Sequence, residues 1–335
     1  MYQLLGICLA LAALLVVNAC ASFFAALVWR AVSRRAQTWR ASTRARFLFA
    51  LRTWPAVCAL VCVAALLFPA YFLYEPRAST EIVTMKLALL ATLSMLGLML
   101  AARRGIGAWY ATRKLSIDWL RHAEPLCLPN IGVPVYRIEH RFPVIAVVGA
   151  FRPRLFIATQ VSDALDADEL HAALRHESGH LTARDNLKRT LVRLCSDALS
   201  IIPAGCTLDR AWAENAEAAA DEYVVRTSGA RGALDLASAL LKIARMVPDG
   251  ARPTMPAGAF LIGENVDGVA WRVRRLTELA VEENCESEHE TALMPCAAAF
   301  WCGCGIVALA LLVAADSHSL IALHNFIEQV VSALQ

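Results

Sequence analysis

The amino-acid sequence predicts an α+β membrane protein with four transmembrane helices and a mainly helical cytoplasmic domain that contains a small antiparallel sheet. Three observations favour this fold class. The 335 residues are 58% hydrophobic and only 18% charged, with a mean hydropathy of +0.50, which is too apolar for an ordinary soluble protein. Several uncharged stretches are long enough to cross a bilayer. Between them lies a polar region that combines helical patterns with short runs rich in Val, Ile and Phe.

The membrane part is expected to comprise residues 1–103, with spans at about 4–29, 53–74 and 87–102. The first two spans are joined by an arginine-rich connection. Its arginines are Arg30, Arg34, Arg35, Arg40, Arg44, Arg46 and Arg52. By the positive-inside rule this connection faces the cytoplasm, so the N-terminus is expected outside. Arginines beside apolar segments are more typical of a membrane surface than of nucleic-acid binding.

A fourth span is predicted at residues 295–315, which places the short tail at 316–335 outside. Residues 104–294 between the third and fourth spans are then cytoplasmic. The basic residues that follow the third span agree with this orientation. The expected location is a bacterial inner membrane, with the polar domain on its cytoplasmic side.

The polar domain is predicted to open with loop-like sequence and then to form three short strands. These strands are expected at residues 135–139, 144–151 and 155–161. An amphipathic helix follows at about 187–202. Further helices are predicted at 211–227, 233–246 and 271–283, with a Pro/Gly-rich loop at 247–265.

Two histidines and a glutamate at a fixed spacing carry the chemistry of this domain. His176 and His180 stand four positions apart, so on a helix they share one face and can bind one metal ion, with Glu177 beside them as a base. Asp166 and Glu169 form a predicted capping box that starts a helix just upstream. Because this context places the motif on a helix, we interpret it as two zinc ligands and a general base rather than a chance match.

A catalytic zinc ion needs a third protein ligand, and an acidic stretch downstream of His180 offers candidates. Glu217 and Asp221 stand four apart on a predicted helix, so one can bind metal while the other hydrogen-bonds a ligand histidine. The alternative is a solvated acidic helix face. The intact histidine motif favours the metal interpretation.

These motifs resemble those of the membrane-embedded gluzincin peptidases, in which His-Glu-x-x-His is followed on a later helix by Glu-x-x-x-Asp. Residues 176–187 and 217–222, together with the layout of the spans, are similar to the beta-lactam sensor-transducer (antirepressor) peptidases in particular. The resemblance implies that His176, His180 and Glu217 hold Zn²⁺. It also implies that Glu177 is the general base and that Asp221 orients a ligand.

The expected function is that of an integral membrane zinc endopeptidase that cleaves itself or a cytoplasmic regulator such as a transcriptional repressor. Its expected partners are a protein or peptide substrate and the lipid bilayer, without direct nucleic-acid binding. The related heat-shock and prenyl-protein type would instead serve membrane-protein quality control. A non-catalytic signalling scaffold is the alternative from another class, and the intact Glu177 argues against it.

Overall fold

The computed structural model describes residues 2–74, 83–128, 131–198, 205–247 and 266–283, with a few further positions between 316 and 329. The predicted fourth span at 295–315 lies outside the described residues, as do most of the predicted external tail and of the Pro/Gly-rich loop. Where the domain boundaries fall therefore stays a prediction.

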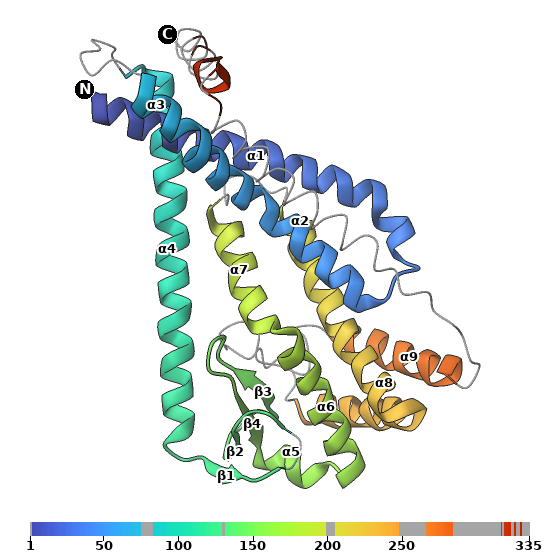
Figure 1. Ribbon diagram of the computed structural model, residues 1–335. Coiled ribbons are helices and arrows are strands. Elements are labelled where there is room, and N and C mark those ends of the chain that lie inside the picture. Colours follow the sequence, from blue (N-terminus) through green and yellow to red (C-terminus); the bar gives the residue numbers. More distant parts are fainter. Residues whose placement is uncertain are drawn as a thin grey trace.

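Three long helical segments form the apolar part of the molecule (Figure 1). They are α1 (Tyr2–Ala36), a rod built from α2 (Ala41–Val61), η1 (Cys62–Leu67) and α3 (Phe68–Tyr74), and α4 (Met85–Leu120). Each contains a stretch apolar and long enough to cross a bilayer, in agreement with the first three predicted spans. The helices extend past those spans, because Arg and Lys are good helix formers and continue a helix rather than end it.

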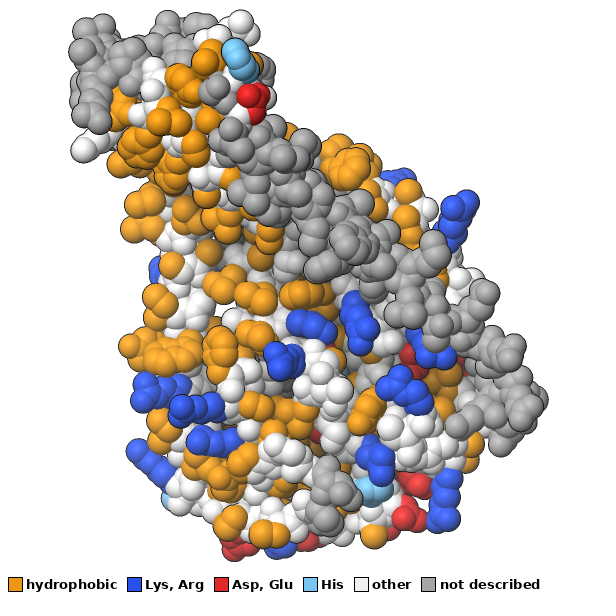
Figure 2. Space-filling view, viewed as in Figure 1, with side chains coloured by type: hydrophobic (Ala, Val, Ile, Leu, Met, Phe, Trp, Pro, Cys, Tyr) orange, Lys and Arg blue, Asp and Glu red, His pale blue; other side chains and the backbone are white. Residues whose placement is uncertain are grey.

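Apolar and basic side chains separate along the molecule (Figure 2). Hydrophobic side chains dominate the upper part of the visible face, around the three long segments, whereas Lys and Arg side chains gather lower down. Phe23, Phe72 and Leu89 are each 60% exposed or more. Large apolar side chains exposed on the same helices are typical of a surface that contacts lipid.

The polar domain begins with a four-stranded sheet in the order β1-β2-β4-β3. Its strands are β1 (Glu124–Leu126), β2 (Val135–Ile138), β3 (Ile145–Val148) and β4 (Arg154–Ala158). The sheet is mixed, so the prediction of an antiparallel sheet was wrong: β4 inserts between β3 and β2 and runs parallel to β2. The prediction also missed β1, whose Pro125 lowers strand propensity but is tolerated on an edge strand.

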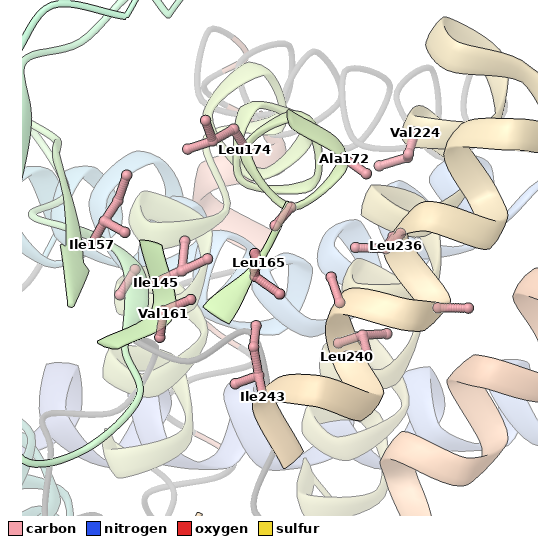
Figure 3. Close-up of a cluster of buried hydrophobic side chains, with 14 of the residues drawn as sticks. Ile145, Ile157, Val161, Leu165, Ala172, Leu174, Val224, Leu236, Leu240 and Ile243 are labelled. Atoms are coloured by element: carbon pink, nitrogen blue, oxygen red, sulfur yellow. The ribbon is translucent and has the colours of Figure 1, made fainter. Parts of the chain in front are cut away.

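Five helices follow the sheet. They are α5 (Thr159–Ala164), α6 (Ala167–Ala183), α7 (Asp185–Ala198), α8 (Cys206–Met246) and α9 (Val266–Glu283). The long α8 is interrupted at Gly229, whose φ of 71° lies outside the helical region, and this break separates the two helices predicted there. The predicted amphipathic helix corresponds to α7. The hydrophobic core lies between the sheet, α6 and the second half of α8, where Ile145, Leu174 and Leu240 are buried (Figure 3).

The membrane helices contact the polar domain directly. Arg52 of α2 is buried, and its Nε lies 2.6 Å from Asp209 Oδ1 of α8. Glu222 of α8 accepts a hydrogen bond from the backbone N–H of Ala41, at 2.9 Å, and so holds the start of α2. α8 also carries the acidic residues singled out in the sequence, so α2 packs on the helix that holds both of them.

Candidate metal centre

The helix that carries the histidine motif begins as the sequence predicts. Asp166 accepts a hydrogen bond from Glu169 N–H at 2.9 Å, and Glu169 accepts one from Asp166 N–H at 3.0 Å, which confirms the capping box. Glu169 is itself buried, and it also accepts hydrogen bonds from Ser238 and Lys242 of α8, both at 2.6 Å. The start of α6 is therefore fixed against the second half of α8.

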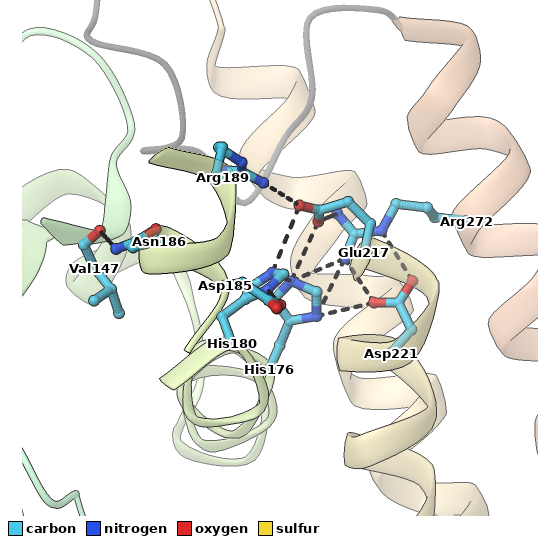
Figure 4. A network of polar contacts seen from close by, with 9 residues as sticks. All are labelled: Val147, His176, His180, Asp185, Asn186, Arg189, Glu217, Asp221 and Arg272. Atoms are coloured by element: carbon cyan, nitrogen blue, oxygen red, sulfur yellow. Dashed lines mark hydrogen bonds and ion pairs between the residues drawn. The ribbon is translucent and has the colours of Figure 1, made fainter. Parts of the chain in front are cut away.

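Three side chains converge from α6 and α8 (Figure 4). His176 Nε2 lies 3.2 Å from His180 Nε2, and each nitrogen lies 3.5 Å from an oxygen of Glu217. Donors held about 2.0–2.2 Å from a tetrahedral zinc ion are separated by roughly 3.4 Å, so the two nitrogens and the two carboxylate oxygens, one facing each nitrogen, have the spacing that zinc requires. Glu217 Oε2 is also buried without a hydrogen-bond partner in the described part of the chain. The residues present therefore fit a zinc ion.

A carboxylate orients each histidine. Asp185 Oδ2 lies 2.8 Å from His180 Nδ1, and Asp221 Oδ1 lies 3.0 Å from His176 Nδ1. If each Nδ1 carries the proton that it donates to its carboxylate, the lone pair of each Nε2 is left for the metal. Glu217 thus lies with the metal-facing nitrogens, and Asp221 lies behind one of them.

Arg272 of α9 completes the cluster, and nothing in the sequence pattern pointed to it. Its Nε and Nη2 donate to the two oxygens of Asp221 at 3.0 and 2.6 Å, and its Nη1 lies 3.4 Å from Glu217 Oε2. Burial raises the pKa of Asp221, but the charge of Arg272 and the contact with His176 outweigh burial and lower it to about 2. Asp221 is therefore a permanently charged acceptor.

The cluster carries an excess of negative charge. Glu177, Asp185, Glu217 and Asp221 contribute four carboxylates to it. Among the described residues, the cations paired with them are three: Lys188 with Asp185, Arg189 with Glu217, and Arg272 with both Asp221 and Glu217. Burial lowers the pKa of His180, but the charge of Glu217 and the hydrogen bond to Asp185 outweigh burial and raise it to about 10. A site that attracts a proton this strongly also favours a divalent cation in its place.

Glu177 lies beside the three donors, on the wall of a small cavity. It is 5% exposed, and burial raises the pKa of its carboxyl group, as expected for a general base used near neutral pH. The cavity measures about 10 Å³, which is room for roughly one water molecule. Its walls include Val147 of β3, Asn186 of α7 and the carboxylate of Glu217.

Sequence reasoning missed Asp185, Asn186 and Arg272. Asp185 follows directly on the end of α6, where Arg184 adopts a left-handed conformation with φ 54° that turns the chain into α7. An acidic residue directly after the motif helix could have been recognised in the sequence as a partner for His180. Arg272 offered no such signal, because only the packing of α9 on α8 brings it to the site.

The fold and the site together define a class: a metallopeptidase in which a helix supplies two histidines and a glutamate base, and a later helix supplies a third, acidic donor. In agreement, residues 143–247 match the model of peptidase family M48. This stretch includes β3, β4, the histidine motif and both acidic candidates, and the match supports a metallopeptidase of that family. Comparisons with curated proteins and with solved structures found no match.

Proposed function

We propose that the chain is an integral membrane zinc endopeptidase whose catalytic domain faces the cytoplasm, and that it cleaves itself or a cytoplasmic regulator. The observation that carries the proposal is the convergence of His176, His180 and Glu217 beside the buried Glu177. The family match over residues 143–247 and the three apolar helices support a membrane metallopeptidase. The resemblance to the sensor-transducer peptidases motivates the regulatory role.

Each residue of the site has a distinct task in this proposal. His176, His180 and Glu217 would hold the zinc ion. Bound there, zinc would supply Lewis-acid chemistry that polarises the scissile carbonyl and acidifies a water molecule. Glu177 takes the proton of the attacking water and delivers it to the leaving amine, because its carboxylate is within reach of the cavity and its pKa is raised by burial.

The edge strand β3 is the expected place for the substrate main chain. Ala158 N–H of β4 donates to the Val144 carbonyl, so by the alternation of an antiparallel pair the backbone groups of Val147 point outward, away from β4. An extended peptide could pair with this edge as an added strand. Here the side chain of Asn186 already donates to the carbonyls of Val147 and Gly149, at 2.9 and 3.2 Å.

These features favour a protease that is restrained by access. A cavity of about 10 Å³ admits no peptide, so the walls must separate before a substrate can reach Glu177. The contacts of α2 with α8 through Arg52 and Glu222 offer a route by which a change in the membrane part would move one wall. A regulated enzyme needs this kind of restraint, because a substrate that is bound through its main chain alone is recognised with little sequence preference.

A comparison of cells that carry wild type or Glu177→Ala tests the proposal. Loss of the base should abolish peptide hydrolysis by the purified protein while zinc stays bound. In the cell, one or a few regulators should accumulate. Accumulation of many unrelated membrane proteins would favour the quality-control alternative. Unchanged hydrolysis by the variant would contradict the assignment of the base, and no hydrolysis by the wild type would favour the scaffold.

A further inference from the structure

A second, much larger cavity lies on the other side of the histidine helix. Its volume is about 860 Å³, and it is partly open to solvent. It is bordered by the turn between α1 and α2, the end of α6, the middle of α8 and one face of α9. Six arginines line it: Arg40, Arg44, Arg46, Arg226, Arg274 and Arg275. The acidic residues on its walls are Asp185, Glu222 and Glu278. We call it the arginine cavity.

Each of these carboxylates already has a partner, and two of the partners, Arg274 and Arg275, line the cavity themselves. Asp185 contacts His180, and Glu278 accepts from Arg274 at 2.9 Å. Glu222 is shared between Arg275 and the backbone N–H of Ala41. The positive charge of the cavity walls therefore exceeds what their acidic groups neutralise.

Two guanidinium groups retain unused hydrogen-bond donors. Arg44 Nε and Arg275 Nη1 are buried, and neither has a hydrogen-bond partner in the described part of the chain. The two arginines are close enough to interact electrostatically, and both are near Glu222. Like charges with unsatisfied donors are costly to bury, unless an anion with several acceptor oxygens sits between them. A phosphate group matches this demand, since guanidinium groups bind it through paired hydrogen bonds.

The position of the cavity suggests the source of the phosphate. α1 leaves its predicted span near Trp29 and reaches the cavity at Gln37, a rise of about 12 Å along the helix. Because a helix that crosses a bilayer at an angle descends by less than its own length, the cavity lies at most that far below the bilayer core, which is close to the headgroup layer. Trp39 and Trp271 also line the cavity, and tryptophan is typical of the membrane interface.

We propose that the arginine cavity binds a phosphate-bearing anion, and its place favours the headgroup of an acidic phospholipid as the source. Such a ligand would bridge Arg44 of α2 and Arg275 of α9. Since Arg272 precedes Arg275 by about one turn of the same helix and contacts Glu217 and Asp221, the ligand would also hold α9 against the metal centre. Bound lipid would thus stabilise the catalytic arrangement from the membrane side.

The test uses the purified full-length protein in neutral phosphatidylcholine vesicles, with phosphatidylglycerol or inorganic phosphate added. Retained lipid is measured by mass spectrometry, melting temperature by a thermal scan, and hydrogen exchange in residues 266–283 reports on α9. We expect preferential retention of phosphatidylglycerol, a higher melting temperature and slower exchange in α9. Arg44→Gln/Arg275→Gln should lower the affinity roughly 100-fold, because each variant side chain loses a charge-assisted pair with the phosphate that contributes about a factor of ten or more.

The matched control is Arg103→Gln/Arg113→Gln, which removes two exposed arginines from α4, outside the cavity. It should bind like the wild type.

Stabilisation by inorganic phosphate alone, lost only in the cavity variant, would support the site with a soluble anion as its source. Equal binding by the wild type and the cavity variant overturns the proposal. Arginine-dependent binding of an acidic peptide, with no response to lipid or phosphate, overturns it in favour of a substrate surface. Because these readouts do not use peptidase activity, they separate this proposal from the catalytic one.

Discussion

The buried guanidinium of Arg272 is the ion-pair partner of Asp221, the carboxylate that lies behind His176. Arg272→Ala would leave Asp221, which is 0% exposed, without its bidentate partner. Removal of one member of a buried ion pair costs about 3–5 kcal/mol, so we expect a loss of this size in denaturant unfolding. Arg272→Lys should recover part of it, because one charged donor remains.

Arg274 provides the comparison for Arg272 on the same helix. Its side chain is 82% exposed and pairs with Glu278 across one turn. Arg274→Ala should change the free energy of unfolding by less than about 1 kcal/mol, as is usual for surface ion pairs. Equal destabilisation by the two variants would contradict the structural role of Arg272.

Glu217 is expected to be the third zinc ligand. Glu217→Ala should lose bound zinc much as His180→Ala does, whereas Asp221→Asn should weaken zinc affinity about 10 to 100-fold. Zinc content of the purified variants measures this by elemental analysis. Glu214→Ala is a suitable control, because Glu214 is 61% exposed and pairs only with Arg210 among the described contacts. Full zinc occupancy in Glu217→Ala would reject the assignment.

At the level of elements, the close approach of α6 to α8 sets the distance between the histidines and Glu217. A Cβ atom added at Gly179 would lie 3.2 Å from Ala220 Cα and 3.3 Å from Tyr223 Cβ, which is tighter than ordinary contact. Gly179→Ala should therefore push the two helices apart by a few tenths of an ångström. Because a catalytic constellation tolerates only small displacements, we expect a fall in peptidase activity with the fold retained.

Gly268 of α9 provides the control for the substitution at Gly179. A Cβ atom there meets no atom within 4 Å, so Gly268→Ala should leave activity unchanged and add up to about 1 kcal/mol of helix stability. Circular dichroism would show that both variants fold. If Gly179→Ala retained full activity, the spacing of α6 and α8 would not limit catalysis.

The start of α6 should make stability depend on pH. Burial raises the pKa of Glu169, but hydrogen bonds from Lys242, Ser238 and Asp166 N–H outweigh burial and lower the pKa below its ordinary value of 4.5. The carboxylate is then more acidic in the folded than in the unfolded chain. Its stabilising contribution is complete above the unfolded pKa and is lost as the pH falls through the lower folded pKa.

The measurement compares denaturant unfolding of wild type and Glu169→Gln between neutral and acidic pH. The wild type should be more stable by about 1–3 kcal/mol at neutral pH, and the difference should shrink below about pH 4.5. Glu278→Gln, at an exposed position, should show no such dependence. A difference that stays constant with pH would contradict the role of the charged carboxylate.

For the whole molecule, the arrangement of arginines around the spans predicts orientation. A reporter fused after residue 120 or residue 250 should report the cytoplasm, and one fused after residue 335 should report the outside. Enzyme reporters that are active on only one side of the membrane measure this. A signal from outside at residue 250 would overturn the orientation, and with it a cytoplasmic substrate.

Local geometry made several features predictable from sequence. The spacing of His176 and His180 fixes their common face on any helix, and the pairing of Asp166 with Glu169 involves only residues within one turn. Three apolar segments were recognisable for the same reason, since a span is defined by length and hydropathy alone. Strand positions were approximately right, because β-branched residues cluster in them.

Only the tertiary structure decided how distant elements combine. The strand order of the sheet depends on which strands pair with β4, and local strand propensity does not specify that pairing. Likewise, the spacing of Glu217 and Asp221 leaves open which of them binds metal, and only the resemblance assigned Glu217 to that task. The packing of α8 against α6 brings Glu217 to the metal-facing nitrogens and Asp221 behind His176. Arg272 reaches the site only because α9 packs on α8. Such long-range contacts arise from the burial of whole helix faces, which no short stretch of sequence specifies.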